Sequence, residues 1–376
     1  MIIAVNAWML RKKELDGIGT FTKEVFSRMI RNNPGIRFLI LCDRGFTADY
    51  YNYPNAEIFR IFPSYRHPLL YLLYQETVLV RFLKKHKPDL LIAPDGLLSL
   101  LSDTKQISCM HDINYMHQPK DLDLKNRIYY RTFFQLFAKK ATRIATVSHY
   151  SKKDIMKTMS VKEDKIDVVY SGIKNNFFPI PEVDKIATRN KHADGNPYFL
   201  FVGTLHPRKN IIRLIRAFDL FLKKTQSKLQ LVIVGNFMWD NKDIMSTYQT
   251  IQYKSAIHIT GRVSEEELNL IYQSAYAMAF VPTFEGFGLP ILESYEAGIP
   301  LITSNVTSMP EIAGNGALLV DPFNIEEISD AMVRLYKNEN NLCEQLVVRG
   351  SIQKQKYSWD DTAERMLRCV QTTLHS

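Results

Sequence analysis

The stretch VPTFEGFGLPILESYEAGIP, residues 281–300, places two glutamates, Glu285 and Glu293, on either side of a glycine-rich turn. A proline suits the first position of a helix after this turn, and a glycine followed by a second proline ends the segment. The pattern therefore predicts a short helix over residues 290–297. Glu293 then lies one turn into the helix, and Glu285 lies in the loop before it.

The turn between the two glutamates is suited to an anionic ligand. Gly286 and Gly288 let the backbone approach a ligand closely, and the helix start offers unpaired N–H groups with a partial positive charge. Each carboxylate can accept hydrogen bonds from two neighbouring hydroxyls, as in the vicinal diol of a ribose or a hexose. Isolated glutamates are mostly solvated surface groups, but this combination indicates a pocket for a phosphorylated sugar.

The string that begins at Glu285 and ends at Glu293, with G-F-G-L-P inside it, resembles the donor-site signature of family 4 glycosyltransferases. These are retaining enzymes of the GT-B fold. The resemblance implies an α/β protein of two doubly wound Rossmann-like domains that face an interdomain cleft. It also implies that Glu293 binds the ribose hydroxyls of a nucleotide sugar and that Glu285 lies at the transferred sugar. The donor-binding residues implied between them are Gly286, Phe287, Gly288 and Leu289.

A second informative loop, GTLHPRKN, begins at Gly203 after a predicted strand and opens into a helix. Arg208 and Lys209 lie at the start of that helix, where their charges would neutralise a diphosphate. Adjacent basic residues are usually a solvated pair. The loop, however, resembles the corresponding donor loop of the family, which implies catalytic roles for both side chains and a donor contact for Gly203. Negative charge grows on the leaving phosphate during transfer, so the two cations would favour the transition state.

Three further sites are implied by the resemblance. Gly17 and Gly19 resemble the first-domain loop that faces the donor phosphates and the acceptor; a lone G-x-G without a third glycine disfavours a dinucleotide-binding dehydrogenase. His111 follows a predicted strand and matches the histidine that contacts the transferred sugar, through its ring or its backbone carbonyl. Arg262 and Val263 lie where the nucleotide base is bound.

Apolar strand-like runs alternate with helix-like segments along the whole chain, which predicts α/β domains with parallel sheets. We expect residues 1–180 to form an acceptor-binding domain, a polar, proline-containing stretch at 181–197 to be the linker, and residues 198–356 to bind the nucleotide sugar. By resemblance, residues 357–376 form a helix that crosses back to the first domain. The predicted strands are 2–6, 37–42, 90–93, 106–110, 143–147, 167–170, 198–202, 229–234, 256–259, 277–281, 301–303 and 318–320.

Composition limits the other possibilities. The chain has 376 residues and a net charge of +9, and its four cysteines are scattered, which suits a reducing cytoplasm. We find neither a secretory signal nor an apolar run of the ~20 residues that would span a bilayer. Asp121 and Asp123 form a D-x-D without partner ligands, so we expect no metal and no cofactor beyond the nucleotide-sugar substrate.

The positive charge lies in the first half, where residues 1–200 contain 31 Lys and Arg against 20 Asp and Glu. Such an excess can attract nucleic acid, anionic lipid or an anionic substrate. No nucleic-acid recognition motif accompanies it. Residues 126–140 alternate aromatic and basic residues at helical spacing; this segment either lies on a membrane or, as is more common, turns its aromatic side to the core.

We therefore predict a retaining glycosyltransferase that transfers a hexose, with mannose favoured, from a GDP- or UDP-sugar to a glycan or a polyprenyl-diphosphate-linked acceptor. The setting would be surface polysaccharide synthesis, in the cytoplasm or at the inner face of the membrane. A GT-B sugar-nucleotide 2-epimerase would need additional carboxylates in the first domain and would lack the G-F-G-L-P string. A basic nucleic-acid-binding protein would not need the paired glutamates.

Overall fold

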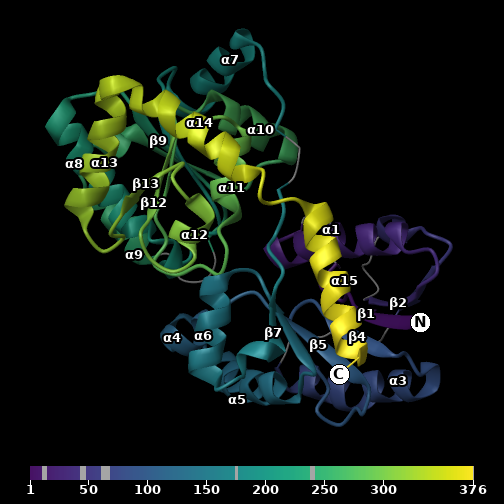
Figure 1. Cartoon of the computed structure of the whole chain (residues 1–376). Coiled ribbons are helices and arrows are strands. Elements are labelled where there is room, and N and C mark those ends of the chain that lie inside the picture. Colours follow the sequence, from purple (N-terminus) through teal and green to yellow (C-terminus); the bar gives the residue numbers. More distant parts are fainter. Residues whose placement is uncertain (11–14, 43–47, 61–67, 174–176, 238–241, 376) are drawn as a thin grey trace. The chain divides into compact units, whose positions relative to one another are not determined.

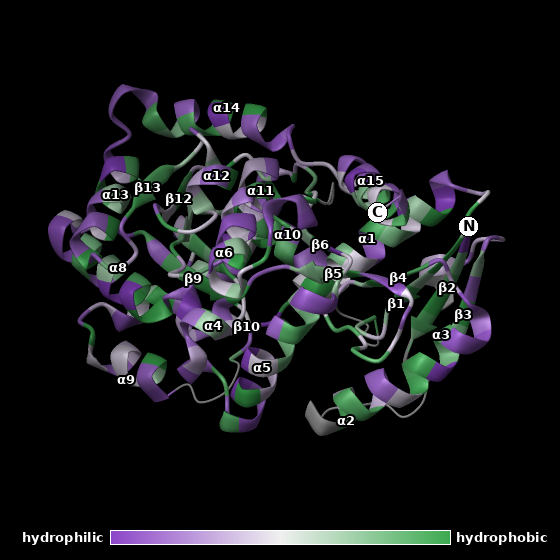
Figure 2. Ribbon diagram, turned by 60° about the horizontal axis from the view of Figure 1, so that its bottom comes forward, coloured by the Kyte–Doolittle hydropathy of each residue, from purple (hydrophilic) through white to green (hydrophobic). Residues whose placement is uncertain are grey.

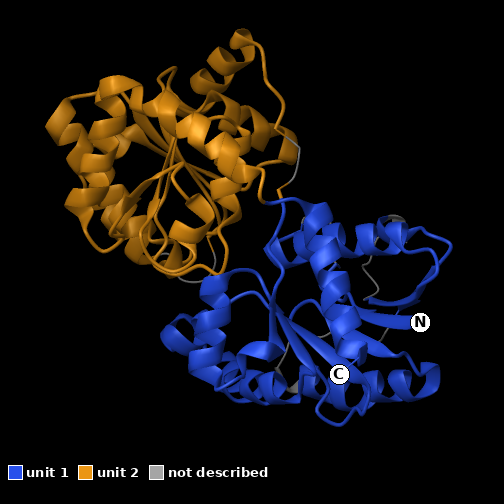
Figure 3. Ribbon diagram, in the orientation of Figure 1, with its two compact units in different colours: residues 1–172, 357–376 blue, residues 173–356 orange. Residues whose placement is uncertain are grey.

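The computed structural model describes residues 1–10, 15–42, 48–60, 68–173, 177–237 and 242–375. The chain folds into two compact units (Figure 3): unit 1 contains residues 1–172 and 357–376, and unit 2 contains residues 173–356. Each unit is an α/β layer structure with its own parallel sheet, as the alternation of strand-like and helix-like segments predicted.

Unit 1 contains a seven-stranded sheet in the order β3-β2-β1-β4-β5-β6-β7, with every neighbouring pair parallel (Figure 1). Its strands are β1 (Ile2–Asn6), β2 (Arg37–Cys42), β3 (Ala56–Arg60), β4 (Leu90–Ala93), β5 (Lys105–Met110), β6 (Arg143–Thr146) and β7 (Ile166–Val168). Its helices are α1 (Gly17–Asn32), η1 (Ala48–Tyr51), α2 (Pro68–Leu73), η2 (Tyr74–Leu79), α3 (Val80–His86), α4 (Asn114–His117), η3 (Pro119–Asp121), α5 (Leu124–Lys140), α6 (His149–Met159), η4 (Glu163–Lys165) and α15 (Trp359–His375).

Unit 2 contains a six-stranded parallel sheet in the order β10-β9-β8-β11-β12-β13. Its strands are β8 (Tyr198–Val202), β9 (Gln230–Val234), β10 (Ile257–Gly261), β11 (Ala277–Phe280), β12 (Leu301–Ser304) and β13 (Leu318–Val320). Its helices are α7 (Glu182–Ala193), η5 (Pro207–Lys209), α8 (Ile211–Thr225), α9 (Lys242–Thr250), η6 (Lys254–Ala256), α10 (Glu265–Ser274), α11 (Leu289–Glu296), α12 (Met309–Ala313), α13 (Ile325–Lys337), η7 (Glu339–Asn341) and α14 (Leu342–Lys354).

Both sheets reverse their strand order at one place, which positions the candidate sites. In unit 1 the chain moves outward from β1 to β3 and then returns to the other side of β1 with β4. In unit 2 the same reversal lies between β8 and β11. The loops that follow such a pair of parallel strands diverge to opposite sides of the sheet, so they leave a crevice that is the usual ligand site of doubly wound folds.

Helix α5 turns its aromatic side to the interior of unit 1. Tyr129, Phe134 and Phe137 are buried in one core cluster, and Tyr130 and Phe133 pack against that cluster. This settles the choice left open by the sequence in favour of the core-facing arrangement of these rings. Polar and apolar residues follow one another along α5, as the hydropathy colouring in Figure 2 shows.

The last helix, α15, packs against α1 and belongs to unit 1. Lys105 donates hydrogen bonds from Nζ to the backbone carbonyls of Thr373 and Leu374, both at 3.1 Å. A cation at this position compensates the negative end of the helix dipole. At the other end of α15, the Arg28 guanidinium on α1 pairs with the Asp360 carboxylate at 3.1 Å.

The expected linker at residues 181–197 differs from the structure. Residues 182–193 form α7, which packs against α10 inside unit 2, and the division between the units falls after residue 172. The prolines and charges of this stretch suggested a loop. However, Pro181 precedes the helix, where a proline is tolerated, and Glu182 and Asp184 favour the positive end of the helix dipole.

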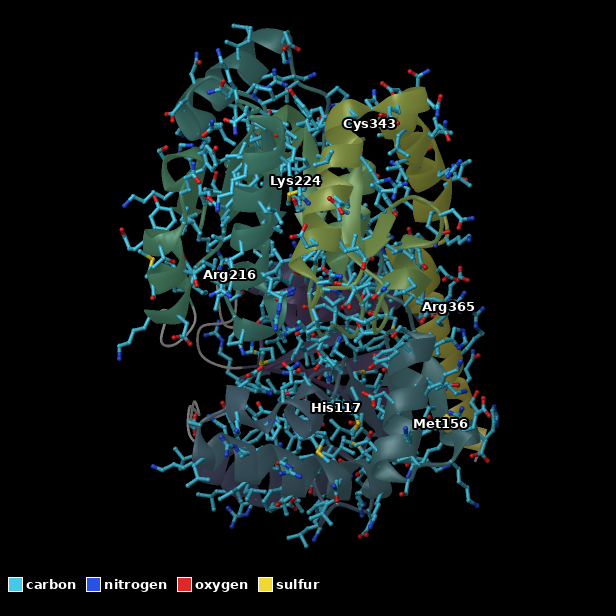
Figure 4. All side chains as sticks on the ribbon, turned by 90° about the vertical axis from the view of Figure 1, so that its left-hand side faces the viewer. His117, Met156, Arg216, Lys224, Cys343 and Arg365 are labelled. Carbon is cyan, nitrogen blue, oxygen red and sulfur yellow. The ribbon has the colours of Figure 1, made fainter. Side chains whose placement is uncertain are left out.

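Side-chain pairs join neighbouring helices in unit 2. Lys224, labelled in Figure 4, extends from α8 to α13, where the carboxylates of Glu326 and Asp330 each accept a hydrogen bond from its Nζ at 2.8 Å. The two acceptors are exposed, so this network contributes modestly to stability. None of the helices in the described ranges has both the length and the apolar composition needed to span a membrane.

Replacing Gly172 by alanine is expected to destabilise unit 1. A Cβ atom at this position would lie 2.2 Å from the backbone nitrogen of Trp359 and 2.6 Å from the carbonyl carbon of Ser358. Backbone atoms cannot move aside like a flexible side chain, so we expect a loss of roughly 1–3 kcal/mol or more and a lower midpoint of thermal unfolding. Gly35→Ala is the control, because nothing lies within 4 Å of its added Cβ. Equal midpoints for the two variants would contradict the close docking of α15.

Candidate active site

In unit 2 the loops that follow β8 and β11 are joined to each other by hydrogen bonds. The Thr283 N–H donates to the Arg208 carbonyl at 2.8 Å. Asn210 is buried, adopts a left-handed conformation with φ 64°, and donates from Nδ2 to the carbonyls of Val281 and Pro322 at 3.0 and 2.7 Å. Few residues tolerate this conformation as well as asparagine. Asn210 therefore fixes where the two preceding basic residues lie.

Glu285, Arg208 and Lys209 converge at this point. The Glu285 carboxylate oxygen Oε1 lies 2.5 Å from Nη1 of Arg208 and 2.5 Å from Nζ of Lys209. Arg208 also donates to the Phe284 carbonyl at 3.2 Å, and Lys209 Nζ lies 5.1 Å from the centre of the Phe280 ring. The sequence thus singled out an adjacent basic pair and a glutamate more than 70 residues further along the chain, and the structure brings the three side chains into one cluster.

The charges of this cluster determine the protonation state of Glu285, which is only 7% exposed. Burial by itself would raise the pKa of its carboxyl group. The charges and hydrogen bonds of Arg208 and Lys209 outweigh this effect, so the pKa of Glu285 is lowered from its ordinary value. The cluster therefore contains an ionised carboxylate and two cations near neutral pH, with one positive charge in excess.

Ser308 stabilises the glycine-rich turn after Glu285 by hydrogen bonds to its backbone. Its hydroxyl donates to the carbonyls of Glu285 and Phe287 at 2.9 and 3.2 Å. Gly288 precedes α11 with φ 100°, and an added Cβ would lie 2.6 Å from the Met309 Cε atom. The backbone conformation therefore favours glycine at position 288, and a larger residue would also displace the end of the Met309 side chain. Helix α11 follows within one residue of the predicted bounds.

Glu293 is the fifth of the eight residues of α11 and is partly exposed. Its Oε2 atom accepts a hydrogen bond from the buried Tyr272 hydroxyl at 2.6 Å. The edge of the Phe177 ring packs against Tyr272, with the ring centroids 4.8 Å apart. Sequence reasoning assigned no role to Tyr272, Ser308 or Asn210. Tyr272 and Ser308 resemble ordinary core and loop residues in the sequence, whereas the position of Asn210 within the GTLHPRKN loop was a signal that could have been used.

Two glycines let β8 and β9 approach closely at the edge of this site. Gly235 has φ 149°, and a Cβ there would lie 1.9 Å from the Gly203 carbonyl oxygen. Beyond them, Asn236 accepts a hydrogen bond from the Arg262 N–H at 3.0 Å, and Arg262 itself is exposed. Val263 is half-buried next to it. Gly203, Arg262 and Val263 thus follow the carboxyl ends of β8 and β10 in unit 2.

In unit 1, Gly17 and Gly19 form the first turn of α1 rather than a separate loop. Asp16 caps this helix and accepts a hydrogen bond from the Gly19 N–H at 2.8 Å. An added Cβ on Gly19 would lie 3.2 Å from the Leu15 side chain. The Gly19 N–H is therefore already satisfied by a carboxylate, and a contact of these glycines with donor phosphates stays a prediction.

His111 follows β5 in unit 1, and its ring is fixed on two sides. Its Nε2 atom lies 2.9 Å from the Pro94 carbonyl, and the Phe21 ring packs edge-on with centroids 4.8 Å apart. Burial is the main cause that lowers the pKa of His111. A carbonyl can only accept, so this hydrogen bond places the proton on Nε2 and leaves Nδ1 as an acceptor. Its backbone carbonyl accepts only a long hydrogen bond, 3.5 Å, from Ser151.

Residues 121–123 serve the local structure of unit 1. The Asp123 carboxylate caps α5 and accepts a hydrogen bond from the Asn126 N–H at 3.0 Å. Within the described ranges, no group of three or more His, Cys, Asp or Glu side chains is arranged to hold a metal ion.

Comparison with known proteins is consistent with these features. The family model described as Glycosyltransferase Family 4 matches residues 15–177, and that described as Glycosyl transferases group 1 matches residues 182–352. The chain is 27% identical to O-antigen chain mannosyltransferase B of Escherichia coli, over 68% of each chain. It is 29% identical to O-antigen chain mannosyltransferase RfbU of Salmonella typhimurium, over 71% of this chain and 73% of that one.

Two solved structures share the fold over almost the full length of the chain. Sucrose-phosphate synthase of Thermosynechococcus elongatus has a TM-score of 0.78 at 17% identity and covers 99% of this chain and 98% of its own. HepE of Anabaena in complex with UDP-glucose has a TM-score of 0.74 at 14% identity and covers 99% of each chain. Since the two family models match consecutive halves and the fold is that of GT-B enzymes, the chain belongs to the group 1, family 4 glycosyltransferases.

Proposed function

We propose that this enzyme transfers a hexose, with mannose favoured, from a nucleotide diphosphate sugar to a glycan or a polyprenyl-diphosphate-linked glycan. The reaction would retain the anomeric configuration and would serve surface polysaccharide synthesis. The observation that carries the proposal is the cluster of Arg208, Lys209 and Glu285 at the strand-order reversal of unit 2. The naming of the two bacterial relatives as O-antigen mannosyltransferases supports the sugar and the pathway.

In this proposal the donor lies along the carboxyl ends of the strands in unit 2. Arg208 and Lys209 bind the diphosphate, and the turn over residues 286–289 faces the sugar. Glu293 binds the ribose diol with its carboxylate, which the Tyr272 hydroxyl orients. The acceptor hydroxyl attacks from the side of the departing phosphate, which takes its proton. Glu285 then keeps the two cations in place and does not act as a nucleophile.

The proposal is tested by incubating the protein with radiolabelled GDP-mannose and a panel of UDP-sugars. We expect slow hydrolysis of one donor in the absence of acceptor, and NMR of the released sugar should show the donor's own anomer first. Lys209→Ala should lower kcat by about 10²–10³, because one group that stabilises charge in the transition state is lost. Lys228→Ala removes an exposed lysine of the same unit and should have no effect. Undiminished turnover of Lys209→Ala would exclude the proposed role.

Glu293→Gln is expected to weaken binding of the donor by about 10–100-fold, since hydrogen bonds to a charged group contribute about 1.5–3 kcal/mol. The loss should be much smaller for a donor with a 2′-deoxyribose, because that donor lacks one of the hydroxyls that the carboxylate binds. Isothermal titration with both donors measures the difference. An equal loss for the two donors would show that Glu293 does not contact the ribose.

We further propose that the outer side of unit 1 binds an anionic membrane, which would bring the enzyme to a lipid-linked acceptor. On α5 the exposed side chains Leu124 and Ile128, 64% and 59% exposed, are accompanied by exposed basic residues. The neighbouring α2 exposes Leu70 and Leu73. Apolar and basic side chains together favour binding at an anionic lipid surface. The other exposed basic and apolar residues of α5 are Lys125, Arg131, Leu136 and Lys139.

Flotation with vesicles of phosphatidylglycerol tests this surface. We expect the wild-type protein to float at low salt and to be released at high salt, because charge attraction is screened. The double variant Leu124→Ser and Ile128→Ser should remain at the bottom of the gradient. The matched control is Val348→Ser with Ile352→Ser on α14, whose side chains are both 58% exposed. If both double variants float equally well, α5 is not the membrane-binding surface.

A further inference from the structure

The strand-order reversal of unit 1 carries a second group of polar and aromatic side chains that the proposed donor site does not use. Asn6 ends β1 and Trp8 follows it, while Asp95 follows β4 on the other side of the reversal. The Trp8 indole N–H donates a hydrogen bond to Asp95 Oδ2, and this bond joins the two loops. A cluster of side chains therefore lies at the strand-order reversal of unit 1, just as the Glu285 cluster lies at the strand-order reversal of unit 2.

Asp95 is a partly buried carboxylate that is paired only with neutral donors. Besides Trp8, the Leu97 N–H donates to its Oδ1 at 3.2 Å. Among the described residues no lysine, arginine or histidine forms an ion pair with it. A carboxylate can accept about four hydrogen bonds, so acceptor positions are left over. Burial raises the pKa of Asp95 to about 6, and its ionised form at neutral pH is costly without a further partner.

Aromatic rings and a buried amide lie near Asp95. The Trp8 ring packs on Tyr71 with centroids 5.4 Å apart, and Tyr71 packs on Tyr129 at 6.1 Å. Such rings offer apolar faces to the C–H groups of a pyranose. Asn6 is 1% exposed and accepts from the Tyr74 hydroxyl at 3.4 Å, but its amide nitrogen Nδ2 has no hydrogen-bond partner among the residues that the structure describes. Buried polar groups are nearly always satisfied, so an unpaired donor here needs an explanation.

We propose that Asp95, Trp8 and Asn6 form a carbohydrate-binding site in unit 1, in which the Asp95 carboxylate accepts hydrogen bonds from hydroxyls of the acceptor's terminal sugar. This inference rests on the proposed function. Another polar side chain lies next to this group: the His111 ring, which follows β5, is hydrogen-bonded to the Pro94 carbonyl, directly before Asp95. All of these residues belong to unit 1.

A purely structural role for Asp95 predicts different behaviour. In that case the carboxylate would serve only to join the loops after β1 and β4. Asparagine keeps one of the two acceptor oxygens, so Asp95→Asn would preserve the bond from Trp8, would lose the 3.2 Å bond from the Leu97 N–H, and would leave sugar binding intact. A ligand-binding carboxylate, in contrast, loses strength when its charge is removed, because hydrogen bonds to charged acceptors are about twice as strong as those to neutral ones.

The experiment uses the full-length protein and a panel of methyl glycosides: α-mannoside, β-galactoside and N-acetyl-β-glucosaminide. Saturation-transfer NMR and titration measure their binding, and separate titrations measure the affinity for GDP and UDP. We expect at least one glycoside to bind the wild-type protein. Asp95→Asn should weaken that binding by about tenfold or more and leave nucleotide affinity unchanged. Trp8→Phe, which keeps an aromatic ring but removes the N–H donor, should weaken it less.

Asp103→Asn is the control, because Asp103 is an exposed aspartate of the same unit between β4 and β5. If no glycoside binds the wild-type protein, or if Asp95→Asn binds as well as the wild type, the inference is overturned. Failure of GDP and UDP to bind the wild-type protein would instead contradict the proposed function, so the two results are distinguishable.

Stability provides a readout that does not depend on any ligand. A carboxyl group whose pKa is raised in the folded state binds more protons folded than unfolded between pH ~4 and ~6, so stability falls as the pH rises through this range. We expect Asp95→Asn to remove this pH-dependent fall in folding stability. The variant should therefore unfold at a higher temperature than the wild type at pH 8. The titratable neighbours Cys109, Tyr129 and Tyr130 have raised pKa values, and His111 titrates in both proteins and cancels in the difference. A lower midpoint for the variant at pH 8 would identify Asp95 as a structural residue.

Discussion

The buried ion cluster of Glu285 with Arg208 and Lys209 determines the arrangement of the donor site. A buried carboxylate without partners would be protonated or would destabilise the fold, and two unpaired cations beside the sheet would repel each other. The Glu285 carboxylate compensates both positive charges, with its Oε1 atom 2.5 Å from Arg208 Nη1 and 2.5 Å from Lys209 Nζ. The loops after β8 and β11 must therefore meet. The hydrogen bonds of Asn210, Thr283 and Ser308 hold the backbones of these two loops close enough for the ion cluster to form.

The two units share one strand order over six strands, to which unit 1 adds β7, but they carry different chemistry at the reversal. In unit 2 the crevice holds an excess of positive charge, which suits a diphosphate. In unit 1 it holds a carboxylate, an amide and aromatic rings, which suit hydroxyl groups and apolar ring faces. A transferase that joins an anionic donor to a neutral sugar needs two sites of opposite character. One duplicated topology can supply both, because the loops that follow the strands vary independently of the sheet.

The sheets were predictable from the sequence because buried parallel strands are continuous apolar runs; β8 and β13 have the predicted bounds. Strand β3 was not predicted, since this edge strand is half-exposed and contains Glu57 and Arg60. In the donor site, charged residues after strands were identifiable, whereas Tyr272 was not: its role depends on a hydroxyl that meets Glu293 only in the folded state. Asp95 was missed for the same reason, because nothing in the sequence relates it to Trp8, which lies on the other side of the strand-order reversal.

The pairing of Glu285 with the cations also bears on catalysis under the proposed function. If Arg208 and Lys209 were unpaired, they would bind the substrate and the product diphosphate with full strength, and tight ground-state binding does not accelerate transfer. Glu285 competes for the same donors and reduces the net charge offered to the ligand to about one. When the bond to the sugar breaks, the leaving phosphate gains further negative charge and competes more strongly for the cations. The stabilisation thus increases as the reaction proceeds, which is the condition for lowering the barrier rather than only retaining the donor.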